Sequence, residues 1–199
     1  MKGKLFFVAD THFSYAPILK RENRPFKDIQ EHDEVLITNI NSQVSRDDIL
    51  YHLGDFCNYN QRDRESWHRA LPLVRFIKCR VRLIIGNNEF RLIRDEFGGD
   101  FEAFREYAMF LGFDDVLPNC TLNLHDEQVF LTHRPTDHRE GCFNLFGHTH
   151  RAGGLWRPFG INVGIDLNHF YAFSEDELRR LRSEKLKYWD TDKDMNCLF

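Results

Sequence analysis

Two histidines one residue apart, within Gly147-His148-Thr149-His150, are the side chains of this chain best placed to do chemistry. Imidazole is the commonest metal ligand among neutral side chains. Two imidazoles at this spacing lie on the same face of an extended strand or converge across a tight loop, and the glycine before them lets the backbone run close to an ion. The segment therefore predicts a pair of metal ligands.

Further candidate ligands stand upstream, in four short segments that each follow an apolar run. The segments are Asp10-Thr11-His12, Gly54-Asp55, Gly86-Asn87 and Thr132-His133. Together with the histidine pair they supply seven candidate ligands: Asp10, His12, Asp55, Asn87, His133, His148 and His150.

This ligand set combines four imidazoles, two carboxylates and one amide oxygen. It suits Mn, Fe, Zn or Ni better than Ca or Mg alone, and the absence of cysteine argues against a structural zinc site. Seven ligands exceed what one tetrahedral ion needs but fit two ions, if one carboxylate bridges them. Two ions about 3.5–4 Å apart can clamp the attacking and leaving oxygens of a displacement at phosphorus.

Each segment alone has an ordinary structural explanation. Asp10 can cap a helix, Gly54-Asp55 can end a strand, and Gly86-Asn87-Asn88 is typical of a turn. The combination of five segments in this order, each after a strand-like run, favours the metal site.

The elements that must position these residues alternate along the first half of the chain. Helical patterns are expected over 30–45, 62–71, 89–96 and 100–111, and a capping box at Ser174 predicts a further helix. Strands are expected at 5–8, 49–53, 81–85, 129–131 and 143–146, rich in branched and aromatic residues. The order β-α-β-α-β followed by β-rich sequence predicts two packed sheets with helices outside. Polar groups beyond the carboxyl ends of strands are how such sheets build sites.

Composition limits the class of protein. The 199 residues are expected to form a single domain over 1–199, with a loosely held tail from about residue 190. The net charge of −4 argues against strong binding of a nucleic-acid polymer. No apolar run approaches the ~20 residues of a membrane span. The five cysteines form no CxxC pair, which favours reduced thiols and a cytoplasmic location.

The order of motifs resembles the calcineurin-like metallophosphoesterase superfamily, whose pattern is DxH, GD, GNH[D/E], H and GHxH. The resemblance spans residues 5–166. The stretches 10–13, 23–26 (Asn-Arg-Pro-Phe) and 51–56 are similar to a small bacterial and phage branch. The resemblance implies an α/β fold, a four-layer α/β/β/α sandwich of two mixed sheets flanked by helices. It also implies ligands for two metals: Asp10, His12 and His150 for one, Asn87, His133 and His148 for the other, and Asp55 as the bridge.

Asn88 departs from the family pattern, in which many members have a histidine that protonates the leaving oxygen. An amide donates a hydrogen bond but gives up no proton near pH 7. Catalytic roles are expected for Asn88, Asp55 and His148, and substrate contacts for Asn88 and Arg134. Because the acid is missing, a diester or an activated ester is the favoured substrate.

The expected function is a phosphodiesterase that hydrolyses a nucleotide-like or other small phosphoester, by direct attack of metal-bound hydroxide on phosphorus. Two divalent ions are the expected cofactors, with Mn²⁺ favoured and Fe, Zn or Ni as rivals. A phosphomonoesterase or protein phosphatase is the alternative within enzymes. A non-catalytic metal-binding module that kept the fold is the alternative outside them. The sequence leaves the oligomeric state and the natural substrate open.

A few other residues carry weaker signals. His52 is expected to be packed in a strand, and His138 to be a surface-loop histidine, with replacement of the missing acid as its alternative role. Asp166 either supports the site from a turn or caps a helix. The cluster Arg62, Arg64 and Arg69 is read as a solvated helix face.

Overall fold

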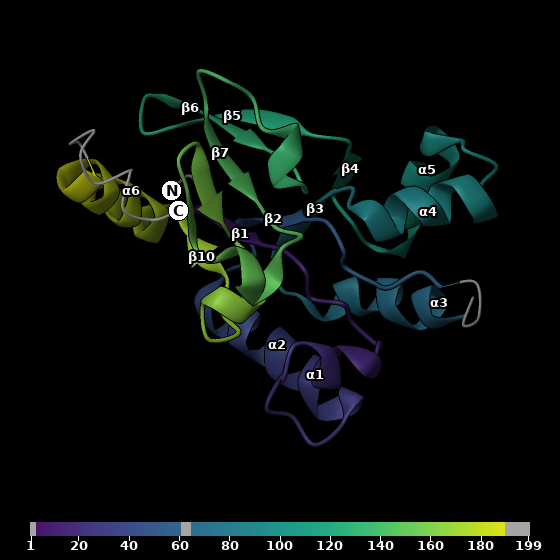
Figure 1. The fold of residues 1–199 in the computed structure, drawn as a ribbon. Coiled ribbons are helices and arrows are strands. Elements are labelled where there is room, and N and C mark those ends of the chain that lie inside the picture. The colour runs from purple at the N-terminus through teal and green to yellow at the C-terminus, as the bar shows by residue number, and fades with distance from the viewer. Residues whose placement is uncertain (1–2, 61–64, 190–199) are drawn as a thin grey trace.

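Two five-stranded mixed sheets stack on each other in the computed structural model, which describes residues 3–60 and 65–189 (Figure 1). The first sheet has the order β10-β1-β2-β3-β4, with β1 to β4 parallel and β10 antiparallel. Its strands are β1 (Leu5–Val8), β2 (Ile49–Leu53), β3 (Arg80–Ile84), β4 (Asp115–Leu117) and β10 (Phe173–Ser174).

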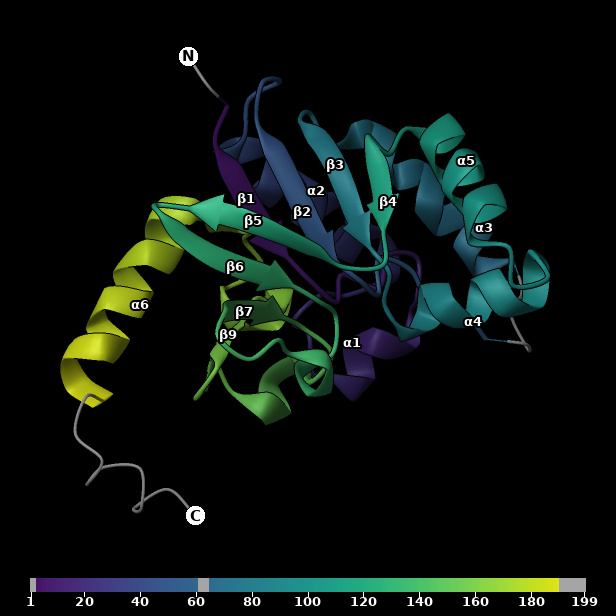
Figure 2. The same cartoon turned by 90° about the horizontal axis from the view of Figure 1, so that it is seen from above.

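The second sheet follows the first after a short turn at Pro118 and Asn119. Its order is β5-β6-β7-β9-β8, with β6, β7 and β9 parallel to one another. Its strands are β5 (Cys120–Leu124), β6 (Glu127–Leu131), β7 (Phe143–Phe146), β8 (Trp156–Arg157) and β9 (Gly160–Asn162). Figure 2 shows β5 and β6 crossing over the first sheet.

The alternation of side chains along each central strand divides the core in two. Phe6 and Val8 point toward the helices, whereas Phe7 packs between the sheets with Leu131 and Leu145. This is the period-2 pattern of a strand with both faces buried. The strands expected at 5–8, 49–53 and 143–146 have these bounds, and the other two differ by one or two residues at an end.

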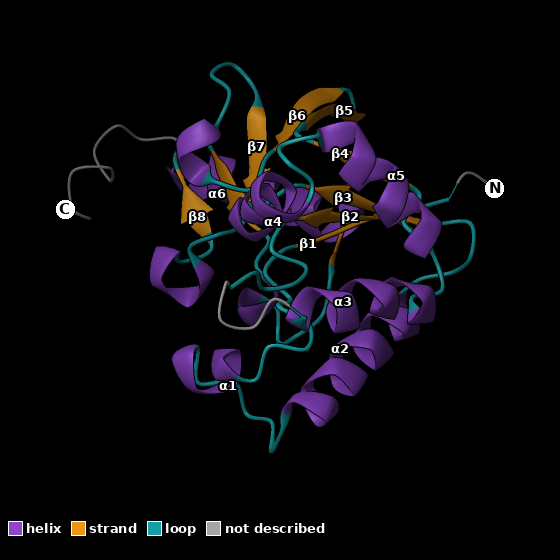
Figure 3. Cartoon of the chain, turned by 90° about the vertical axis from the view of Figure 1, so that its right-hand side faces the viewer, coloured by secondary structure: helices purple, strands orange, loops and turns teal. Residues whose placement is uncertain are grey.

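A layer of helices covers the outer face of the first sheet (Figure 3). Asp28 caps α2 by accepting a hydrogen bond from the Glu31 backbone at 2.8 Å, and Leu36 and Ile40 on that helix are fully buried. The helices on this side are α1 (Pro17–Arg21), α2 (Ile29–Gln43), α3 (Ser66–Ala70), η1 (Leu71–Phe76), α4 (Asn87–Glu96) and α5 (Phe101–Leu111).

The second sheet has a thinner covering. The predicted C-terminal helix is α6 (Glu175–Trp189), whose Leu178 packs into the core between the sheets. The loop after β6 covers the outer face, where the Arg139 guanidinium lies 4.2 Å from the Phe130 ring centre. The remaining 3-10 helices are η2 (Pro135–Asp137), η3 (His150–Gly153) and η4 (Ile165–Leu167). The predicted fold class, two mixed sheets flanked by helices, is confirmed.

Several sequence expectations need correction or fall outside the described residues. Of the helix expected over 62–71, residues 66–70 form α3 and residues 62–64 lie outside the described residues. The chain continues as the 3-10 helix η1, because Pro72 cannot donate a helical hydrogen bond. Short strands were expected after Gly112, without bounds, and β4 and β5 are two of them. The tail from residue 190, and Arg62 and Arg64 of the basic cluster, lie outside the described residues. Within 3–60 and 65–189, no helix has the length and hydrophobicity needed to cross a membrane.

Candidate metal centre

The structure brings the seven predicted ligands together at one end of the two sheets. Asp10 and His12 follow β1, Asp55 follows β2, and Asn87 begins α4 after β3. His133 follows β6, and His148 and His150 follow β7. Residues before the turn at Pro118 thus supply four of the candidates, and residues after it supply three.

Backbone hydrogen bonds extend the two sheets into this region. The amides of Asp10 and His12 donate to the carbonyls of Gly54 and Asp55 at 3.1 and 3.0 Å, so the loops after β1 and β2 stay paired. Across the sheets, the Ala9 amide donates to the Val163 carbonyl at 3.0 Å. The loops that carry the ligands are therefore held by the sheet framework.

Five of the seven candidates adopt positive φ angles, which bulky L-residues rarely do. They are Asp10 (60°), His12 (50°), Asp55 (54°), His148 (72°) and His150 (46°). Left-handed backbone at non-glycine residues costs free energy, and the surrounding fold must impose it. Such strain concentrated in one place is typical of functional sites.

Two glycines permit the close approach of the loops. A Cβ atom on Gly147 would lie 2.4 Å from Ala9 Cβ and 2.6 Å from Asp10 Oδ2. Gly54 has a φ of 83°, and a Cβ there would lie 2.6 Å from Gly86 Cα. Any larger residue at either position would push the ligand loops apart.

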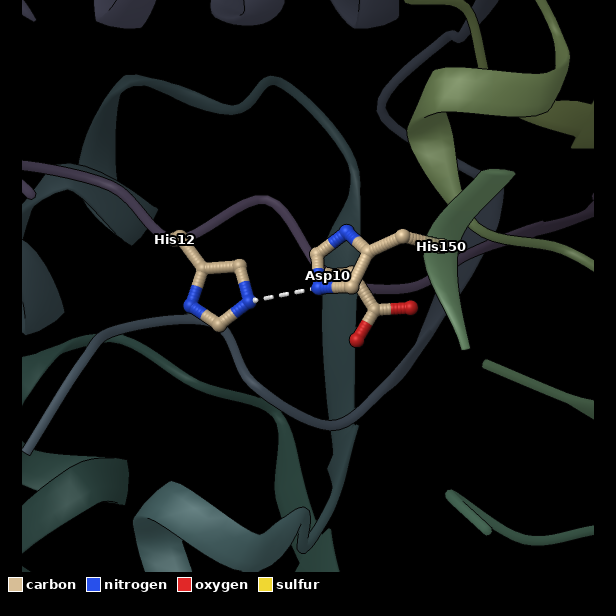
Figure 4. A group of neighbouring side chains, drawn as sticks. All are labelled: Asp10, His12 and His150. Atoms are coloured by element: carbon tan, nitrogen blue, oxygen red, sulfur yellow. Dashed lines mark hydrogen bonds between the residues drawn. The ribbon is translucent and has the colours of Figure 1, made fainter. Parts of the chain in front are cut away.

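The first group of ligands consists of Asp10, His12 and His150, all buried (Figure 4). The Nε2 atoms of His12 and His150 lie 3.3 Å apart. Asp10 Oδ2 accepts a hydrogen bond from the His148 amide at 2.8 Å, whereas Asp10 Oδ1 and His12 Nδ1 are buried without a hydrogen-bond partner among the described residues. Buried polar atoms without partners cost free energy. The two facing Nε2 atoms and Asp10 Oδ1 together could bind a cation.

The second group consists of Asp55, His133 and His148, with Asn87 beside it. His133 Nε2 lies 3.1 Å from Asn87 Oδ1 and 3.2 Å from His148 Nδ1. The other ring nitrogen, His133 Nδ1, lies 2.8 Å from the Leu53 carbonyl and must donate to it, because a carbonyl only accepts. Nε2 is therefore the ring nitrogen of His133 that faces the group.

Asp55 lies between the two groups. Its Oδ2 is 3.8 Å from His12 Nε2, and its Oδ1 is 3.5 Å from His133 Nε2. The two oxygens of this carboxylate thus face different imidazoles, one in each group. A ligand that bridges two ions requires this position.

Asn88 and Glu89 hold Asp55 in this position. The Asn88 side chain donates from Nδ2 to Asp55 Oδ2 at 2.7 Å, and the Asn88 backbone N–H donates to Asp55 Oδ1 at 3.0 Å. Glu89 accepts from the backbone amides of Gly86, Asp55 and Phe56 at 2.8, 2.8 and 2.9 Å. The buried Asn88 side chain thus contacts the candidate bridge.

Burial dominates the electrostatics of the centre. It raises the pKa of Asp10 and of Asp55 from 3.8 to about 6 each. The nearby imidazoles oppose the rise at Asp10, and chiefly the hydrogen bonds from Asn88 oppose it at Asp55. Burial next to the Asp55 charge raises the pKa of Glu89 to about 7. Desolvation lowers the pKa of His148 to about 4 and that of His12 well below 6.5. Both imidazoles are thus neutral at pH 7, as metal ligands must be.

His150 is oriented by Asp166. Its Nδ1 lies 3.0 Å from Asp166 Oδ2, and Arg24 donates two hydrogen bonds of 2.8 Å to the same carboxylate. Burial alone would lower the pKa of His150, but the hydrogen bond to Asp166 and the negative charges of Asp10, Glu22 and Asp166 together outweigh it, and the pKa is raised. Of the two roles considered for Asp166, the contact supports the one at the site. Arg24 was missed, although Asn23-Arg24-Pro25-Phe26 stood out as a family-like stretch.

The remaining predicted residues lie around this centre. Arg134 is exposed and lines a cavity of about 310 Å³ together with Asn87 and His133. His52 is fully buried and hydrogen-bonds Thr11 Oγ1 at 2.9 Å, as expected of a packed residue. His138 stacks on Phe159 with ring centres 4.0 Å apart and belongs to neither ligand group.

Comparison with known proteins agrees with this geometry. The model of the calcineurin-like phosphoesterase family matches residues 3–159. The chain belongs to the calcineurin-like phosphoesterase family. Members of this family are metal-dependent phosphoester hydrolases, and the two Asp/His groups found here could each hold an ion.

This calcineurin-like phosphoesterase is 34% identical to the uncharacterized protein MJ1445 of Methanocaldococcus jannaschii, over 89% of its own length and 90% of that protein. A protein of unknown function from Aquifex aeolicus, AQ665, has a TM-score of 0.64 at 21% identity, covering 90% of this chain and 99% of the other. The phosphoesterase Yfce from E. coli has a TM-score of 0.41 at 18% identity, and the match covers 81% of this chain and 78% of that one. The Aquifex structure shows that the fold is shared.

Proposed function

We propose that this calcineurin-like phosphoesterase is a two-metal phosphodiesterase that hydrolyses a small, nucleotide-like phosphoester. The observation that carries the proposal is the position of Asp55, which directs one carboxylate oxygen toward an imidazole of each ligand group. Asp10, His12 and His150 would hold one ion. Asn87, His133 and His148 would hold the other, with Asp55 shared between them.

A pair of divalent cations supplies, when bound, positive charge that polarises the phosphoester and acidifies water. The protein's contribution is to orient the ligands and, by burial, to keep the His12 and His148 imidazoles neutral. The Leu53 carbonyl holds the His133 ring, and Asp166 holds the His150 ring. Asn88 holds the shared carboxylate. Arg134, beside His133, would contact the phosphate and offset the charge that develops on it.

The preference for diesters rests on Asn88. No amide can protonate a leaving oxygen at neutral pH, and the other side chain considered for that task, His138, stacks on Phe159. Substrates whose leaving group needs no proton are favoured, such as aryl and phosphoryl esters. General-acid help is typically worth about 10²–10⁴-fold, so its loss would penalise alkoxide leaving groups strongly.

A nucleotide-like substrate is supported by the cavity that Asn87 and His133 line. Phe90 is 61% exposed at this cavity, and Pro118 and Ile85 lie in its wall. An exposed ring beside the candidate centre offers a surface on which a flat aromatic group can stack. We also propose Mn²⁺ as the ion, with Fe, Zn and Ni as rivals. A cytoplasmic location is supported by the four described cysteines, all of them free thiols.

The test compares bis(4-nitrophenyl) phosphate with 4-nitrophenyl phosphate, using protein stripped of metal and then supplied with Mn²⁺. We expect Mn²⁺-dependent cleavage, with the diester hydrolysed faster. His148→Gln should abolish this activity, whereas the control His125→Gln, at an exposed loop position, should retain it. A higher rate on the monoester would identify a phosphomonoesterase instead. Absence of cleavage despite bound metal would identify a non-catalytic module.

A further inference from the structure

A second cavity, of about 440 Å³, lies between α1 and α4 and has strongly polar walls. Arg21 of α1 and Arg91 and Arg94 of α4 line it. Tyr15 and Asn58 add a hydroxyl and an amide. Arginine is the side chain best suited to bind phosphate, because its planar guanidinium donates two parallel hydrogen bonds to phosphate oxygens.

This cavity adjoins the candidate metal centre. The ring centre of Tyr15 lies 6.3 Å from that of His12. The Tyr59 amide, in the opposite wall, donates at 3.2 Å to the Asn88 side chain that holds Asp55. Arg91 lies one helical turn after Asn87 on α4, so the two residues share a face of that helix.

The arginines of the cavity are only partly neutralised. Arg94 pairs with Asp95, which also lines the cavity, and Arg21 pairs with Glu22. Arg91 is exposed and has no carboxylate partner within the described part of the chain. Among the described residues that line the cavity, three guanidinium groups face one carboxylate, and the balance is still positive when Glu22 is counted with Arg21.

We propose that this cavity is a subsite for a second phosphate group of the substrate, one that is bound but not cleaved. The inference rests on the proposed function and narrows it to phosphoesters that carry an additional terminal phosphate. The scissile phosphate would lie at the Asp55 centre, and the second phosphate would be held by Arg91 with Arg21 and Arg94.

The experiment uses two substrates with the same scissile bond and leaving group. One is propyl 4-nitrophenyl phosphate, and the other carries a terminal phosphate on carbon 3 of the propyl chain. We expect kcat/KM to be about 10- to 100-fold higher for the second substrate, since hydrogen bonds to charged groups are strong. Arg91→Gln should reduce this ratio by at least about tenfold, and high salt should reduce it as well.

The matched control is Arg80→Gln, which removes an exposed arginine at the start of β3, remote from the cavity. It should leave the ratio unchanged. Equal kcat/KM for the two substrates in the unmodified protein, or a ratio that survives Arg91→Gln, would overturn the subsite.

A binding measurement separates this proposal from the proposed function. In calorimetry, the protein should bind propane-1,3-diyl bisphosphate more tightly than propyl phosphate, and Arg91→Gln should remove the difference. If neither ester is cleaved but this selectivity is present, the phosphodiesterase assignment fails and the subsite stands. If the esters are cleaved and the selectivity is absent, only the subsite fails.

Discussion

Arg24 and Asp166, which are 142 positions apart in the sequence, form a fully buried ion pair with two hydrogen bonds of 2.8 Å. Arg24 also donates to the backbone carbonyls of Asp10 and Thr11 at 2.7 Å. It therefore connects the loop that carries two candidate ligands to the carboxylate that orients His150. The pair is part of the support on which the candidate metal centre rests.

Arg24→Met should be strongly destabilising. The substitution leaves Asp166 as a buried charge with only His150 as partner, and breaking a buried pair in this way costs about 3–5 kcal/mol. Urea unfolding followed by circular dichroism measures the loss. The control is Arg105→Met, whose pair with Asp115 is partly exposed and should be worth less than about 1 kcal/mol. Equal effects of the two variants would contradict the role assigned to Arg24.

Asp10→Asn should stabilise the metal-free protein and abolish its response to Mn²⁺. Burial raises the pKa of Asp10 to about 6, which is above its unfolded value. Stability from this group is therefore present at low pH and is lost as the pH rises through about 6. At pH 8 the uncharged amide avoids this cost, but it is a weaker metal ligand.

Thermal unfolding at pH 8, with EDTA and then with Mn²⁺, checks both parts of this prediction. The melting temperature of the unmodified protein should rise on addition of Mn²⁺, because a ligand that binds only the folded state stabilises it. The melting temperature of Asp10→Asn should be higher than that of the unmodified protein in EDTA and should rise less when Mn²⁺ is added. The prediction is wrong if the variant melts below the unmodified protein in EDTA.

Asn88→His should extend activity toward esters with poor leaving groups. The imidazole would supply the proton that an amide cannot give, a contribution typically worth about 10²–10⁴-fold. The quantity to compare is the ratio of kcat/KM for an alkyl ester to that for bis(4-nitrophenyl) phosphate. This ratio should rise even if both rates fall through loss of the hydrogen bond to Asp55. An unchanged ratio in a folded variant would refute the missing-acid argument.

His52 should make the metal-free protein less stable as the pH falls below neutral. Burial lowers its pKa from 6.5 to about 3, so the unfolded chain takes up a proton near pH 6.5 while the folded protein does not. Stability from this group is therefore present above pH 6.5 and declines as the pH falls, by about 2 kcal/mol between pH 7 and 5.

Measuring the free energy of unfolding at both pH values isolates this contribution. The loss between pH 7 and 5 should be smaller for His52→Gln than for the unmodified protein by about the same 2 kcal/mol. Parallel pH dependence of the two proteins would show that His52 is not the titrating group.

The central strands and the ligand loops could be predicted because their signals are local. Leu5–Val8, Ile49–Leu53 and Phe143–Phe146 are short runs of branched and aromatic residues, and each ends two positions before a candidate ligand. The parallel order then places these ends at one edge of the sheets. That edge is where the structure brings the seven candidates together.

Other features depend on contacts that no local pattern encodes. Residues 23–26 and Asp166 each stood out in the sequence, but no local pattern shows that Arg24 and Asp166, which lie in distant segments, are bonded to each other. Glu89 was visible in the Gly-Asn-Asn-Glu segment, but its three backbone hydrogen bonds depend on how β2 and β3 lie together. The strand β4 has three residues, too few to establish a period. These features become apparent only when the sheets are assembled.

The division of the ligands at Pro118 has a consequence for assembly. Asp10 and His12 belong to the first sheet and His150 to the second, so a cation held by all three would cross-link the two layers of the sandwich. Neither half of the chain carries a complete set. Bound metal would therefore stabilise the docked arrangement of the two sheets against any state in which they separate.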